Sequence, residues 1–169
     1  MSRSLAGVVP PPERAAGLRP VYTDEERVRR DATRWTLVQG VLAPLQFVVF
    51  LASLALIVRY LASGEGWAAA ALSVVTKTLV LYLIMITGAI WEKVVFGQYL
   101  FAPSFFWEDA VSMLVIALHT ACLIAWFTGE AWLGPREQML LALAAYAAYV
   151  VNAAQFLFKL RRARRERAA

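Results

Sequence analysis

Four charged residues on either side of one short segment are the first candidates for chemistry. Glu92 and Lys93 end one long apolar stretch, and Glu108 and Asp109 begin the next. Because residues 93–104 are the whole link between these stretches, the acids must lie close together. Carboxyl groups crowded at an apolar boundary favour the protonated form of at least one of them, which is what a general acid requires. Glu108 and Asp109 also suit the first turn of a helix, where the dipole favours negative charge, so a structural role stays open.

Two further polar residues lie deep within apolar stretches. Lys77 is ten residues from Trp67, where its stretch begins, and His119 lies at a similar depth from the same membrane face. A charged side chain within the bilayer costs at least about 2.5 kcal/mol on insertion scales, so we expect it to have a structural or functional role. Lys77 can pack between helices, hold a substrate carboxylate or tune an acid. His119 can pack, donate a proton or ligate the metal of a pigment.

The segment that joins the acids is densely aromatic. From Phe96 to Trp107 it reads FGQYLFAPSFFW, and Trp91 precedes it. Such a segment can anchor the chain at the membrane interface, plug the mouth of a helix bundle or hold a flat hydrophobic ligand. We therefore add Trp91, Trp107 and Lys93 to the candidate substrate-binding residues, beside Lys77 and His119.

Membrane-spanning helices must position these residues. The chain has 169 residues and is 60% hydrophobic, whereas soluble domains are about 45–50% apolar. A span needs about 20 apolar residues, and four stretches meet that need: 35–62, 67–92, 105–128 and 137–159. Tryptophans lie near the predicted span ends, as interfacial residues do. The sequence predicts an all-α membrane protein with four transmembrane helices.

Polar segments flank the predicted membrane domain of residues 35–160. Residues 1–34 form a predicted cytoplasmic arm that contains a surface helix, because Thr23 and Glu26 match a capping box at its start. Residues 161–169 form a basic cytoplasmic tail.

The distribution of Lys and Arg orients the bundle. The arm holds seven arginines, Lys93 follows the second span, and six basic residues lie from Lys159 onward, whereas the opposite side holds Arg59 and Arg136. The positive-inside rule therefore predicts that both termini are cytoplasmic. The basic tail also suits anionic lipid, at roughly 1 kcal/mol per charge. No nucleic-acid motif accompanies these charges, so nucleic acid is not an expected partner.

One long run of sequence is distinctive. From Val75 to Asp109 it reads VTKTLVLYLIMITGAIWEKVVFGQYLFAPSFFWED. This run resembles the 3-vinyl bacteriochlorophyllide hydratase family of bacteriochlorophyll biosynthesis, through the strings TGxIWEK, VFGxYLFAP and FFWED. The string YTDEERxRRDATRW, which starts at Tyr22, and the string MLVxALHT, which starts at Met113, extend the likeness over nearly the whole chain apart from its tails.

The resemblance implies a hydro-lyase reaction. Water would add to the 3-vinyl group of a chlorophyllide or bacteriochlorophyllide and give a 3-(1-hydroxyethyl) group. An acid would protonate the terminal vinyl carbon, and water would add to the inner carbon, with no cofactor required. A carboxyl group kept neutral by its surroundings can be that acid. We assign Glu92 and Glu108 to acid and base in either order, with Asp109 as a third candidate.

The resemblance also implies partners and a location. We expect a magnesium tetrapyrrole substrate and the lipid bilayer as partners, and the cytoplasmic membrane of a photosynthetic bacterium as the location. Self-association, or contact with other pigment-biosynthesis enzymes, stays open. His119 is an alternative axial ligand to the substrate magnesium. Glu108 and His119 share a helix face but are about 16 Å apart along the axis, so the two assignments compete.

Two other classes of function stay open from the residues. The first is a non-catalytic membrane subunit for pigment binding or assembly, in which His119 holds the magnesium. The second is a small transporter or channel subunit that uses Lys77 and the acids as an ion path. The sequence has no evident inverted repeat of the kind that many transporters contain, which argues against the second.

Overall fold

Residues 20–168 are described by a computed structural model, and within them every regular element is helical. The elements, in chain order, are α1 (Asp24–Ala32), α2 (Arg34–Ser63), α3 (Trp67–Phe96), α4 (Phe106–Thr128), the short 3-10 helix η1 (Gly129–Ala131) and α5 (Pro135–Ala168). The predicted all-α class is confirmed. Residues 1–19 of the predicted arm and residue 169 lie outside the described residues.

Four of the helices, α2 to α5, are long and apolar enough to cross a membrane. They match the four predicted spans to within one or two residues at most ends, and α3 and α5 extend well beyond their predicted C-terminal ends. α3 continues beyond residue 92 to Phe96, and α5 runs for 34 residues through the basic tail. Alanine and arginine are strong helix formers, so the end of the apolar stretch does not end α5.

Local caps set the helix boundaries near the acids. Thr23 and Glu26 form the predicted capping box, in which Thr23 Oγ1 accepts from the Glu26 N–H at 3.3 Å and Glu26 Oε2 accepts from the Thr23 N–H at 2.8 Å. α3 ends at Gly97, whose φ of 84° lies in the left-handed region that glycine adopts without a Cβ clash.

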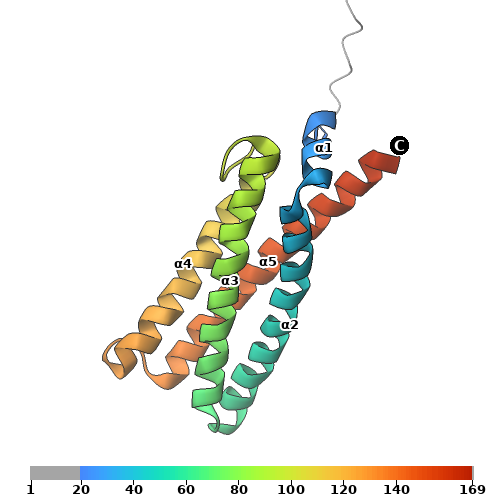
Figure 1. The fold of residues 1–169 in the computed structure, drawn as a ribbon. Coiled ribbons are helices and arrows are strands. Elements are labelled where there is room, and N and C mark those ends of the chain that lie inside the picture. The colour runs from blue at the N-terminus through green and yellow to red at the C-terminus, as the bar shows by residue number, and fades with distance from the viewer. Residues whose placement is uncertain (1–19, 169) are drawn as a thin grey trace, which may run out of the picture.

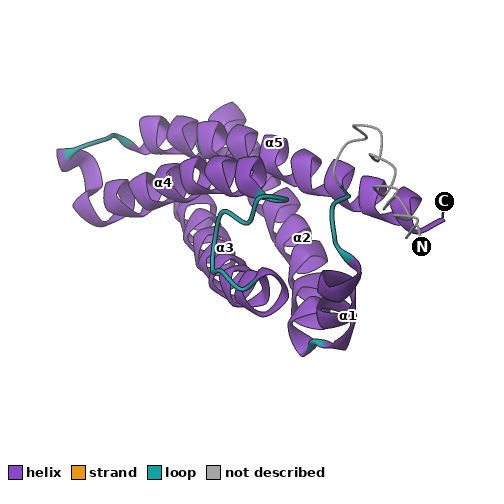
Figure 2. Cartoon of the chain, turned by 90° about the horizontal axis from the view of Figure 1, so that it is seen from above, coloured by secondary structure: helices purple, strands orange, loops and turns teal. Residues whose placement is uncertain are grey.

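The helices pack as two antiparallel pairs (Figure 2). In the first pair, Gln39 of α2 donates to Thr87 of α3 at 2.8 Å. In the second pair, Asn152 of α5 donates to the Glu108 carbonyl of α4 at 2.9 Å. The pairs meet at a core in which Phe50 of α2 contacts the rings of two tyrosines of α5.

The 97–105 loop, α1 and the last turns of α5 lie at the same end of the bundle (Figure 1). We call this the loop end and the opposite one the far end. Four consecutive spans return the chain to the end where it started, which is the arrangement that the positive-inside argument requires.

Candidate active site

Glu92 and Asp109 form a buried pair at the loop end. Glu92 is in the last two turns of α3 and Asp109 is in the first turn of α4, and their carboxyl groups are close enough to interact. Glu92 is 5% exposed and Asp109 is 2% exposed. Two ionised carboxylates buried side by side repel each other, so such a site favours a proton on one of them. We call these two residues the acid pair.

Backbone N–H groups of the loop cover the acid pair. The Phe101 N–H donates to Asp109 Oδ2 at 2.6 Å, and the Ala102 N–H donates to Glu92 Oε2 at 3.4 Å. Phe101 has a φ of 60°, in the left-handed region, which costs a non-glycine residue roughly 1–2 kcal/mol. The loop backbone is therefore strained at Phe101, the residue whose N–H donates to Asp109.

Glu108 contacts α5. Its Oε1 lies 3.1 Å from Lys159 Nζ. Its other carboxylate oxygen, Oε2, is buried and has no hydrogen-bond partner within residues 20–168. Glu108 is nevertheless close enough to Asp109 for their charges to interact. The three predicted acids thus gather at one site, where Glu92 and Asp109 form the buried acid pair and Glu108 is ion-paired with Lys159.

Lys159 is a member of this site that the sequence analysis did not single out. Besides its ion pair with Glu108, its Nζ donates to the Ser104 carbonyl of the loop at 2.6 Å. In the sequence, Lys159 was only one of the six basic residues near the C-terminus. The acids are near one another in sequence, but no spacing rule connects Lys159 with Glu108.

The aromatic side chains at the loop end divide into a packed and an exposed part. The packed part, which we call the plug, consists of the buried Tyr22 and Phe105 and the half-buried Trp91, Phe96 and Phe156. Several of its ring pairs have centroids 5.7 to 6.0 Å apart. Trp91 is anchored there because its Nε1–H donates to Thr36 at 2.9 Å. The plug packs α3, α5 and the loop together at the loop end of the bundle.

The exposed part, which we call the strip, consists of Phe101, Phe106 and Trp107. Their ring centroids are 5.6 Å apart from Phe101 to Phe106 and 5.4 Å apart from Phe106 to Trp107. Trp107 is 71% exposed. Lys93 also faces outward, where its Nζ donates to the Gly97 carbonyl at 2.7 Å and lies 5.3 Å from the ring centroid of Tyr99. Lys93 and Trp107 are therefore at the surface of the site.

Lys77 and His119 lie together in the middle of the bundle, apart from the acids. Lys77 Nζ is 3.8 Å from the centroid of Tyr149, and the His119 ring stacks on Tyr146 at 5.7 Å. Both side chains are fully buried, and among the described residues neither Lys77 Nζ nor His119 Nε2 has a hydrogen-bond partner. Lys77 is fifteen residues from Glu92, or about 22 Å along α3. The expectation that Lys77 and His119 share one level is confirmed.

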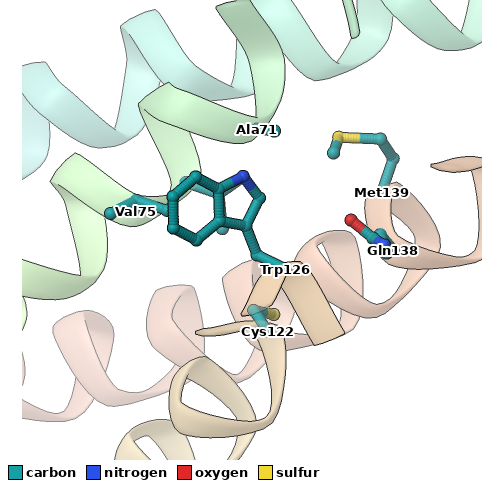
Figure 3. A pocket seen from close by; sticks show the side chains of 7 residues that line it. Ala71, Val75, Cys122, Trp126, Gln138 and Met139 are labelled. Atoms are coloured by element: carbon teal, nitrogen blue, oxygen red, sulfur yellow. The ribbon is translucent and has the colours of Figure 1, made fainter. Parts of the chain in front are cut away.

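A cavity near the far end is too small for a pigment. Its volume is about 10 Å³, which is room for one water molecule at most. Figure 3 shows its lining, which consists of Ala71, Val74, Val75, Cys122, Trp126, Gln138 and Met139. Among residues 20–168 no three His, Cys, Asp or Glu side chains gather to hold a metal ion.

Comparison with known proteins identifies the family. A profile described as 2-vinyl bacteriochlorophyllide hydratase matches residues 22–162. The chain belongs to that family. A 2-vinyl bacteriochlorophyllide hydratase of Cereibacter sphaeroides is 66% identical over 155 residues, which cover 91% of this chain and 94% of the relative. A protein of the same name from Rhodobacter capsulatus is 65% identical over 149 residues, which cover 88% and 85%. No solved structure matches the chain.

The family assignment confirms the resemblance inferred from the sequence. The family's name numbers the vinyl group 2, whereas the family that the sequence resembles was named above with the number 3. The matched residues include the acid pair, Glu108 and Lys159.

Proposed function

We propose that this chain is a membrane hydratase that adds water to the vinyl group of a bacteriochlorophyllide, the reaction for which its relatives are named. The acid pair carries this proposal, because an alkene is a weak electrophile that must be protonated before water can add. A carboxyl group held neutral in a buried site can donate that proton at neutral pH. Glu92 and Asp109, buried together beneath the loop, supply such a group.

In the first step the acid pair transfers its proton to the terminal carbon of the vinyl group. The terminal carbon becomes a methyl group, and the inner carbon becomes a cation that the adjoining macrocycle delocalises. Both carboxyl groups are then ionised. The N–H groups of Phe101 and Ala102 already donate to them, so donors are in position for the charge that develops. Donors fixed in advance lower the barrier more than donors that must reorganise.

In the second step a water molecule adds to the inner carbon and loses a proton to Glu108. Lys159 lies 3.1 Å from Glu108 Oε1, and we assign Glu108 as the base that accepts this proton. Its free Oε2 is the acceptor for the proton of the water. The acid pair gives up one proton and Glu108 gains one, and return of that proton through solvent restores the starting state. No other reactant is needed.

The strip is the proposed binding surface for the macrocycle. A flat, apolar ring system stacks on exposed aromatic side chains, and Phe101, Phe106 and Trp107 form a continuous row next to the acids. Lys93 lies at the same surface and has the charge that suits the free carboxylate of a chlorophyllide. Because the acid pair is almost fully buried, the segment that contains Phe101 must move for the vinyl group to reach it. The left-handed φ of Phe101 makes that movement less costly.

We also propose that the loop end faces the cytoplasm in the membrane of a photosynthetic bacterium. The arginines of α1 and of the last turns of α5 lie at that end, and positive charge is retained on the cytoplasmic side.

A direct assay tests the reaction. Membranes that contain the chain are incubated with a vinyl-bearing bacteriochlorophyllide, and the pigments are separated and weighed by mass spectrometry. The expected product is heavier by one water, and membranes without the chain form none. Retention of unchanged pigment by the purified protein would support the pigment-binding alternative instead. No product under conditions in which a relative is active would contradict the proposal.

A further inference from the structure

Lys159 connects three parts of the site. Its Nζ lies 3.1 Å from Glu108 Oε1 on α4, donates to the Ser104 carbonyl of the loop at 2.6 Å and lies 5.5 Å from the centroid of Phe105 in the plug. The Lys159 side chain is 22% exposed and the Glu108 side chain is 7% exposed. This ion pair is therefore largely shielded from solvent, unlike the surface pairs that contribute little.

The same face of α5 binds Glu108 at two places. Asn152 and Lys159 are seven residues apart, which is two helical turns, so they lie on one face. Asn152 Nδ2 donates to the Glu108 backbone carbonyl at 2.9 Å, and Lys159 binds the Glu108 carboxylate. Ser112 donates to that carbonyl as well, at 2.8 Å. α5 thus fixes both the backbone and the side chain of Glu108.

This arrangement leaves one oxygen of Glu108 available. Oε1 is held by Lys159, whereas Oε2 is buried and has no partner within the described part of the chain. A buried carboxylate oxygen is normally hydrogen-bonded, to protein or to ordered water. The direction of Oε2 is set by the contact that Lys159 makes with the other oxygen.

We infer that Lys159 is a positioning residue for hydration: it holds Glu108 Oε1 and thereby orients Glu108 Oε2 toward the attacking water. This inference rests on the proposed function. It gives Lys159 a role that the other basic residues of the tail do not share. Arg162, for comparison, pairs with Glu166 four residues further along the same helix, at 2.8 Å. The competing role for Lys159 is a topological positive charge alone.

The first test is kinetic and uses full-length protein in membranes. Lys159→Met removes the charge, Lys159→Arg keeps it, and Arg164→Met removes one charge from an exposed position on the same segment. We expect Lys159→Met to lower kcat by at least about 10-fold, as part of the 10²- to 10⁴-fold that a general base contributes, with little change in KM. Lys159→Arg is expected to restore most of kcat, and Arg164→Met to match the wild type.

A double-mutant cycle separates positioning from general stabilisation. If Lys159 acts through Glu108, adding Lys159→Met to Glu108→Gln lowers kcat no further than Glu108→Gln alone. Additive losses in kcat, or equal kcat for Lys159→Met and Arg164→Met, would overturn the inference.

A second readout does not depend on hydration activity. Infrared spectra that compare the wild type with Glu108→Gln identify the bands of the Glu108 carboxyl group. We expect the Glu108 bands to shift in frequency in Lys159→Met, because Oε1 loses the contact with Lys159 Nζ, and to stay unchanged in Arg164→Met. Unchanged Glu108 bands in Lys159→Met would refute the role of Lys159, even if the chain proved to catalyse another reaction. A wild type without hydratase activity but with the expected infrared change would instead refute the proposed function alone.

Discussion

Two substitutions of Asp109 separate the chemistry of the acid pair from the anchoring of the loop above it. Asp109→Asn and Asp109→Ala both remove one carboxyl group of the pair. Asparagine keeps a side-chain oxygen that can accept the Phe101 N–H, which now donates to Asp109 Oδ2 at 2.6 Å. Alanine leaves that N–H without its acceptor. The two variants should therefore agree in activity and differ in stability.

The magnitudes follow from the contacts. Exchanging a charge-assisted hydrogen bond for a neutral one costs about 1 kcal/mol, so Asp109→Asn is expected to lose about that much unfolding free energy. Asp109→Ala is expected to lose about 2–4 kcal/mol, because a buried N–H without a partner costs roughly 1–3 kcal/mol and the Phe101 backbone, at a φ of 60°, loses its restraint. In both variants kcat is expected to fall by about 10²- to 10⁴-fold, the usual contribution of a general acid.

Thermal unfolding in detergent and mass-spectrometric measurement of hydration in membranes give the two quantities independently. Wild-type kcat in Asp109→Asn would refute the acid pair as the proton donor. Equal stability of Asp109→Asn and Asp109→Ala would show that the Phe101 N–H bond does not hold the loop.

Two more variants test the extent of the site. Lys77→Met is expected to keep hydration activity, because Lys77 lies about 22 Å from Glu92 along α3. Its unfolding free energy is expected to change by less than about 2 kcal/mol, because the lost contact with Tyr149 offsets the gain from removing a buried charge. Loss of kcat in folded Lys77→Met would instead return Lys77 to substrate binding, as the sequence predicted. Trp107→Ala is expected to raise KM about 10-fold at unchanged kcat, since it removes a contact that binds substrate and transition state equally. The control is Trp132→Ala, which changes a half-exposed tryptophan at the far end and is expected to leave KM unchanged. Equal KM for the two tryptophan variants would exclude the strip as the substrate-binding surface.

The sequence predicted the fold well because the relevant information is local. Runs of about 20 apolar residues and a Thr23–Glu26 capping box determine helices through contacts within a few turns. The gathering of Glu92, Glu108 and Asp109 was predictable for a similar reason, since one short loop joins α3 to α4 and confines the three acids to one end of the bundle.

The pairing within the site was not predictable. Neighbouring residues on a helix point about 100° apart, so whether Glu108 or Asp109 meets Glu92 depends on the rotation of α4 against α3. That rotation is set by side-chain packing over the whole bundle. The role of Lys159 depends on α5 as well, which returns to the loop end only through tertiary packing. The division of the aromatic segment into plug and strip follows from the path of the loop, including the left-handed φ of Phe101.

The hydration rate of Glu92→Gln tests the central claim most directly. Glutamine has the size of glutamate and can still accept the Ala102 N–H, but it has no acidic proton to share with Asp109. Glu65→Gln, an exposed carboxylate at the far end, is the matched control. We expect Glu92→Gln to accumulate in membranes like the wild type and to lose at least about 100-fold in kcat, while Glu65→Gln keeps the wild-type rate. A wild-type rate in Glu92→Gln would contradict the claim that the Glu92–Asp109 pair protonates the vinyl group.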